Sequence, residues 1–119
     1  MNEPDVRLVL LSGPDAETLE SIAAQVVEEG WAACVNVIPS ARSVYRWKGE
    51  VVRENEALAF VKTVRPALEG LRRRILDLHP YDVPEFLVLP LEAGDARYVA
   101  WVHDAVTAAT EHRESDGEA

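Results

Sequence analysis

Apolar positions in the first third of the chain change from a strand-like run to a helical stripe. Val6–Leu11 is a short, nearly continuous apolar segment, which is typical of a strand buried on both faces. Ser12–Asp15 interrupts this run, and Asp15 is a suitable N-cap residue for a helix. The apolar side chains that follow recur at helical spacing: Ala16, Leu19, Ile22, Ala23, Val26 and Val27. Gly30 then ends the predicted helix.

The middle of the chain predicts a long β-hairpin. Trp31–Lys48 and Val51–Val64 are rich in β-branched and aromatic residues, and Lys48–Glu50 forms the turn between them. Because an ordinary strand has about 5–6 residues, this hairpin must project beyond the rest of the domain. Pro39–Ala41 interrupts the first strand. A proline has no N–H to donate to a strand ladder, so we expect a bulge or kink on a sheet edge there.

The last third of the chain predicts two helices separated by a short strand. Pro66 suits the first turn of a helix with a buried stripe made of Leu68, Leu71, Ile75 and Leu78. Phe86–Leu89 predicts a strand that Pro90 ends. Asp95 is placed to cap a third helix, whose apolar face comprises Tyr98, Trp101, Val102, Ala105 and Val106.

The resulting order is β-α-β-β-α-β-α. Two βαβ-like halves around a central hairpin predict an α+β, ferredoxin-like sandwich with the helices on one face of the sheet. The edges of the long hairpin invite pairing with another chain, which predicts a closed oligomer. We expect a neighbouring subunit to bury Trp47, which alternates with charged residues along the hairpin.

Length, charge and cysteine content limit the classes of function. The 119 residues predict one domain over residues 1–110, followed by a polar tail over residues 111–119. A net charge of −9 repels phosphate backbones, so a nucleic-acid partner is not expected, and the acidic surface attracts cations weakly. Cys34 is the only cysteine, and the chain has neither a signal-peptide pattern nor an apolar run that could span a membrane. A cytoplasmic protein without a membrane partner is therefore expected.

The segment His79–Glu85 is the main candidate for a functional site. Pro80 and Pro84 stiffen this connection between the second helix and the last strand. His79 is the candidate metal ligand, although capping the preceding helix is the simpler role for it. Tyr81 and Glu85 are candidate ligand-binding residues. Glu85 could also cap exposed amides or pair with Lys62.

Three further residues are candidate ligand contacts. Cys34 has the surroundings of a small core residue, and a role as nucleophile would require a partner such as His79. Lys62 is the one charge in an apolar strand segment, and Trp101 could line a pocket or pack in an interface. The basic run Arg72–Arg74 suggests either an anion site or, more simply, a solvated helix face.

Four segments of the chain together resemble the CutA family of divalent-cation tolerance proteins: Ala33–Pro39, Tyr45–Gly49, Lys62–Thr63 and His79–Glu85. The resemblance extends from about Val6 to Val106. It implies a ferredoxin-like fold, a tight homotrimer built by the long hairpins, and a cytoplasmic role in tolerance of copper and other divalent cations. Kinship with PII-like signalling trimers, which bind small molecules between subunits, is also implied.

The resemblance extends to the metal-binding residues of the family only in part. Copper ligation in the family has been associated with a cysteine near the end of the first strand and with a consecutive histidine pair. The corresponding positions here are Leu11, Leu78 and His79, so only one donor matches. We therefore expect weak divalent metal binding, no required cofactor and no enzymatic activity. The alternatives are a PII-like signalling or scaffold trimer with an unidentified ligand or protein partner and, third, an enzyme that uses Cys34 and His79.

Overall fold

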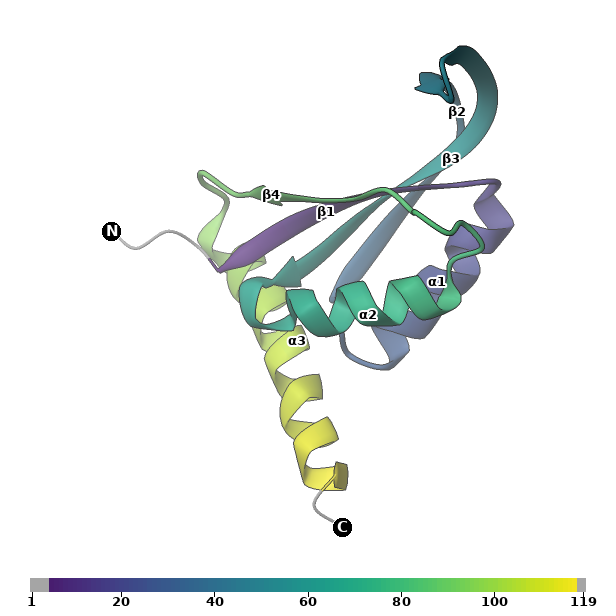
Figure 1. Cartoon of the computed structure of the whole chain (residues 1–119). Coiled ribbons are helices and arrows are strands. Elements are labelled where there is room, and N and C mark those ends of the chain that lie inside the picture. Colours follow the sequence, from purple (N-terminus) through teal and green to yellow (C-terminus); the bar gives the residue numbers. More distant parts are fainter. Residues whose placement is uncertain (1–4, 118–119) are drawn as a thin grey trace.

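The computed structural model describes the backbone of residues 5–117 and the side chains of residues 5–107 (Figure 1). The elements follow the predicted order: β1 (Val6–Gly13), α1 (Ala16–Glu28), β2 (Cys34–Trp47), β3 (Glu50–Val64), α2 (Leu68–Leu78), β4 (Phe86–Pro90) and α3 (Ala96–Gly117). Two predicted caps are confirmed. Asp15 accepts a hydrogen bond from the N–H of Thr18, and Asp95 accepts one from the N–H of Arg97. Pro66 lies in a 3-10 turn that leads into α2.

The four strands form one antiparallel sheet in the order β2-β3-β1-β4, so the chain has a mixed α+β fold. Val9 of β1 is paired with Val61 of β3 on one side and Val88 of β4 on the other. Figure 1 shows α1 and α2 side by side beneath the sheet, with the β2–β3 hairpin curling away from it. The far end of the β2–β3 hairpin is thus the part of the fold least covered by other elements.

The hairpin confirms the predicted break in β2. The pairing register shifts between Ile38 and Ala41, which places the irregularity on an edge strand as expected. β1 ends at Gly13, opposite Ala57, so the part of β3 that precedes Ala57 pairs with β2 alone. Lys48 and Gly49 close the hairpin with positive φ angles of 50° and 81°, which a two-residue turn between twisted strands requires.

The core lies between the sheet and the two helices α1 and α2. Its buried side chains come from the strand positions that face the helices and from the apolar stripes of both helices: Val9, Leu11, Leu19, Ile22, Val26, Ala57, Ala59, Val61, Leu71 and Ile75. Burying this set supplies the main driving force for folding. The strand residues between these positions therefore face the other side of the sheet.

Helix α3 departs from the prediction that all helices cover one face. Its buried residues Val102 and Val106 pack with Val6 and Val64. Side chains alternate along a strand, so Val6 and Val64 belong to the face opposite Val9 and Val61. Two other residues of the predicted apolar face of α3, Tyr98 and Trp101, are 46% and 50% exposed in the single chain. Val99 of the same helix also packs against this cluster.

The polar C-terminal segment continues the helix. The backbone of α3 extends to Gly117, so residues 111–117 are helical, and residues 118–119 lie outside the described residues. A domain boundary near residue 110 stays a prediction.

Candidate functional site

The connection from α2 to β4 begins at His79, which ends the helix. The His79 N–H donates to the carbonyl oxygen of Ile75 at 2.8 Å, and the backbone of His79 is already extended. Pro80 prevents the helix from continuing, as the sequence predicted. The local sequence thereby turns the chain back towards β1 and fixes where the His79 ring lies.

Both ring nitrogens of His79 are engaged within the chain. Nε2 lies 2.7 Å from the carbonyl oxygen of Ser12, and Nδ1 is 3.1 Å from the backbone nitrogen of Tyr81. Since the Tyr81 N–H can only donate, Nδ1 accepts and Nε2 donates to Ser12. The side chain is buried, with 7% exposure. In this arrangement His79 offers no lone pair to a metal ion.

Tyr81 and Glu85 form one group of polar residues with His79. The group also includes Glu56, which sequence reasoning missed. The Tyr81 hydroxyl donates to Oε2 of the buried Glu56 at 2.9 Å, and the Tyr81 and His79 rings are 4.8 Å apart. Burial and the Glu56 carboxylate raise the pKa of Tyr81 above its ordinary value. Burial, and then repulsion from Glu56, also raises the pKa of Glu85. The group therefore couples the loop to the base of the hairpin.

Lys62, Cys34 and Trp101 belong to a second group on the face opposite the core. Cys34 of β2 is the cross-strand partner of Lys62 on β3. The Lys62 Nζ donates to the Tyr98 hydroxyl at 3.0 Å and lies 5.3 Å from the centre of that ring. This hydrogen bond raises the pKa of Lys62, although partial burial opposes the change. Tyr98, which the sequence placed on the apolar face of the third helix, thus connects Lys62 to Trp101, whose ring centre is 5.7 Å away.

The two groups are separate within one chain. Lys62 pairs with Leu8 on β1, whereas His79 contacts Ser12, four residues further along the same strand. That offset corresponds to roughly 13 Å. Cys34 and His79 are therefore not brought together, and the enzyme hypothesis lacks its base within the chain. The alternative pairing of Glu85 with Lys62 is not among the ion pairs of the described residues.

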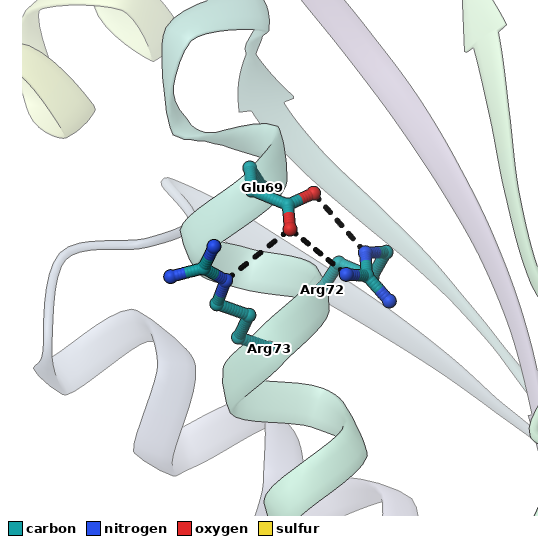
Figure 2. A network of polar contacts seen from close by, with 3 residues as sticks. All are labelled: Glu69, Arg72 and Arg73. Atoms are coloured by element: carbon teal, nitrogen blue, oxygen red, sulfur yellow. Dashed lines mark hydrogen bonds and ion pairs between the residues drawn. The ribbon is translucent and has the colours of Figure 1, made fainter.

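The basic run on α2 is a set of ion pairs (Figure 2). Arg72 and Arg73 both contact the carboxylate of Glu69, at 2.8 Å and 3.2 Å, and Arg74 contacts Glu29 at 2.8 Å. The hydrogen bond from Arg72 is the main reason that the pKa of Glu69 falls to about 2. Carboxylates within the chain already occupy these guanidinium groups, so the solvated-face interpretation fits better than an anion site.

The described residues hold no cluster of three His, Cys, Asp or Glu side chains with metal-binding geometry. At the positions associated with copper ligation, Leu11 is fully buried in the core and Leu78 packs against it. These leucines fill space between the sheet and the helices. They leave His79 without neighbouring soft donors.

Comparison with known proteins identifies the family. The model of the CutA1 divalent ion tolerance protein family matches residues 7–105. The chain belongs to the CutA1 family. The CutA divalent-cation tolerance protein of Thermus thermophilus is 44% identical over 97 residues, which cover 82% of this chain and 94% of that protein. The CutA protein of Mus musculus is 38% identical, and the match spans 82% of this chain but about half (55%) of the mouse protein.

Solved CutA1 structures agree with the fold. The Thermus thermophilus Cut A1 structure has a TM-score of 0.82 at 43% identity, with 84% of this chain and 97% of that chain covered. CutA1 from the psychrotrophic bacterium Shewanella sp. SIB1 has a TM-score of 0.83 at 29% identity, with 87% and 97% covered.

Relatives differ in the compartment that their names record. An Arabidopsis thaliana CutA protein is called chloroplastic, and a CutA structure from Archaeoglobus fulgidus is described as periplasmic. Within the described residues, no helix combines the length and apolarity that crossing a membrane would require. A cytoplasmic location for this CutA1 protein stays a prediction.

Proposed function

We propose that this CutA1 protein is a cytoplasmic, non-enzymatic homotrimer of ferredoxin-like subunits that takes part in tolerance of divalent cations, including copper. The observation that carries the assembly is an apolar sheet face left uncovered by α1 and α2. Leu10 pairs with Phe60 and Leu87 on that face, and Leu87 is 53% exposed in the single chain. Apolar surface of this extent on a small domain favours burial against another subunit.

The hairpin adds a second exposed apolar surface. Val44, Trp47 and Val51 lie on the part of the hairpin that pairs with no other strand and are 62%, 58% and 53% exposed. Large apolar side chains on a projecting ribbon gain little from folding of their own chain. A closed ring of subunits, in which each hairpin lies against the next subunit, would bury them and satisfy the free edge of β2.

Loose cation binding supports the tolerance role better than a dedicated metal centre does. The described residues offer no donor cluster, and the hydrogen bonds of His79 use both ring nitrogens. The net charge of −9 still concentrates cations near the surface. We therefore propose weak, salt-sensitive binding of divalent ions, without a tight site in each subunit.

A second candidate function is a PII-like trimer that binds a small organic ligand. The group around Lys62 favours it. An ammonium beside two half-exposed aromatic rings is more typical of a ligand-binding surface than of a structural contact. Cys34, Lys62 and Trp101 then serve as ligand-binding residues. Tyr81 and Glu85 belong to the separate group at the base of the hairpin, where Tyr81 donates to Glu56.

Light scattering tests the assembly directly. We expect the wild-type protein at micromolar concentration to have three times the mass of the chain. Trp47→Asp should dissociate or unfold it, because the substitution places a charge in an apolar interface. Lys48→Asp adds the same charge at the exposed neighbouring turn residue and should leave the mass unchanged. A wild-type mass equal to one chain would remove the proposal.

A further inference from the structure

The helix layer carries a groove between α1 and the end of α2. The groove has a volume of about 350 Å³, and its lining consists of Asp15, Glu17, Thr18, Ser21, Ile22, Gln25 and Leu78. Figure 1 shows α1 and α2 on one side of the sheet and the hairpin curling away towards the other. The proposed assembly buries the hairpin and the opposite sheet face, so the groove stays open to solvent in the assembly as well as in the single chain.

The polar part of the lining is rich in hydrogen-bond acceptors and carries negative charge. Asp15 accepts the Thr18 N–H with Oδ1 at 2.7 Å, which leaves its second carboxylate oxygen for a ligand. The same backbone hydrogen bond is the main reason that the pKa of Asp15 is lowered, so this carboxylate is ionised at neutral pH. Glu17 adds a second exposed carboxylate. Among the described side chains, those of residues 5–107, no Lys or Arg belongs to the lining.

The rest of the lining combines an apolar floor with the end of a helix. Ile22 is only 4% exposed and belongs to the core, and Leu78 packs against that core. Leu78 also ends α2, whose last turn contains no basic residue. The carbonyl groups at the C-terminus of a helix carry partial negative charge, which favours a cation nearby. The groove therefore offers an apolar surface beside a negatively charged rim.

We propose that this groove binds a small primary amine with an apolar body, a function beyond cation tolerance. The ammonium donates charge-assisted hydrogen bonds to Asp15 and Glu17, and the apolar body packs over Ile22 and Leu78. The same carboxylates repel an anionic ligand. A metal ion is a poorer fit, because no three His, Cys, Asp or Glu side chains converge anywhere in the described part of the chain.

Nuclear magnetic resonance titration of isotope-labelled protein with phenethylamine and with the uncharged phenethyl alcohol tests this site at about 0.15 M salt. The amine should shift the backbone amide signals of Thr18, Ser21 and Gln25 in a saturable way. It should bind about tenfold more tightly than the alcohol, since only the amine forms the charged hydrogen bonds.

A first pair of variants tests the charge. Asp15→Asn removes one carboxylate while keeping a residue that caps helices equally well, and should weaken amine binding about threefold. Glu28→Gln removes an exposed carboxylate from the last turn of α1, outside the groove, and should keep the wild-type affinity. Equal affinities for the two probes, or an Asp15→Asn variant that binds the amine as well as wild type, would overturn the site.

A second pair tests the location. Ser21 and Ala24 are both exposed on α1, but only Ser21 lines the groove. Ser21→Lys places an ammonium in the groove and should abolish amine binding, whereas Ala24→Lys makes the same change of net charge and should preserve it. Equal loss in both variants would assign the binding to overall charge and refute the groove, as would signals that shift without saturating at millimolar amine. All lining residues belong to one chain, so a monomeric wild type that binds the amine as described would refute the trimer alone.

Discussion

The Nε2 atom of His79 lies 2.7 Å from the carbonyl oxygen of Ser12, 67 residues earlier in the chain. This contact joins the α2–β4 connection to the end of β1, next to the point where the hairpin leaves the sheet. With Nδ1 engaged by the Tyr81 N–H, the ring serves as a structural connector. A metal ion could use either nitrogen only by breaking one of these hydrogen bonds.

His79→Ala should therefore affect stability and not metal affinity. Losing the ring leaves the Ser12 carbonyl and the Tyr81 N–H unpaired, which we expect to lower the free energy of unfolding by about 2 kcal/mol. Urea denaturation measures this change. Calorimetry with Cu(II) at moderate salt should give the same weak binding for wild type, His79→Ala and the exposed control His103→Ala. A submicromolar, stoichiometric site that disappears only in His79→Ala would refute this account of the ring.

Glu85→Gln should raise thermal stability at neutral pH. Folding raises the pKa of Glu85 through burial and repulsion from Glu56, so the folded state carries a cost while Glu85 is ionised. That cost disappears as pH falls through the raised pKa, because the folded state then holds the proton. We expect a higher melting temperature for Glu85→Gln at pH 7 and no difference from wild type at about pH 4. The exposed control Glu92→Gln should change neither value, and an advantage that grows on acidification would contradict the assignment.

Gly70→Ala should destabilise the protein although Gly70 lies within a helix. A methyl group at this position would overlap the indole ring of Trp31, whose N–H is fixed by a hydrogen bond to Glu29 at 3.1 Å. Overpacking of this kind costs about 1–3 kcal/mol. The double variant Trp31→Leu/Gly70→Ala should be less destabilised than the sum of the single variants predicts, as expected for residues in direct contact. Additive effects in denaturation experiments would show that the two residues do not meet.

The melting temperature of the wild type should rise with protein concentration. If the hairpin and the uncovered sheet face are buried by neighbouring subunits, unfolding is coupled to dissociation. Scans over a roughly hundredfold concentration range, with reversibility checked by rescanning, measure this dependence. A constant midpoint under reversible conditions would indicate that the single chain is stable by itself.

Local signals in the sequence predicted the elements well. The Asp15 cap, the irregularity near Pro39 and the helix end before Pro80 each depend on a residue with a strong backbone preference. The family resemblance, carried by the segment around Cys34 and by His79–Glu85, is confirmed by the match to the CutA1 family model. These features require only neighbouring residues or a recurring motif.

The polar contacts of the site could not be read from the sequence. Tyr81 meets Glu56 across 25 residues, and Lys62 meets Tyr98 across 36. Both contacts depend on strand register and on where a helix is seated, which no periodicity specifies. The sequence placed Tyr98 and Trp101 on one helical face, but helical spacing gives only a direction and does not show what covers that face.

Native mass spectrometry of the protein, after incubation with excess Cu(II) and desalting at moderate salt, tests the central claim most directly. We predict a single species with the mass of three chains and no retained copper, because the hairpins hold the subunits together and His79 has no lone pair to offer. A species with the mass of one chain, or a trimer that retains one copper ion for each subunit, would contradict the account.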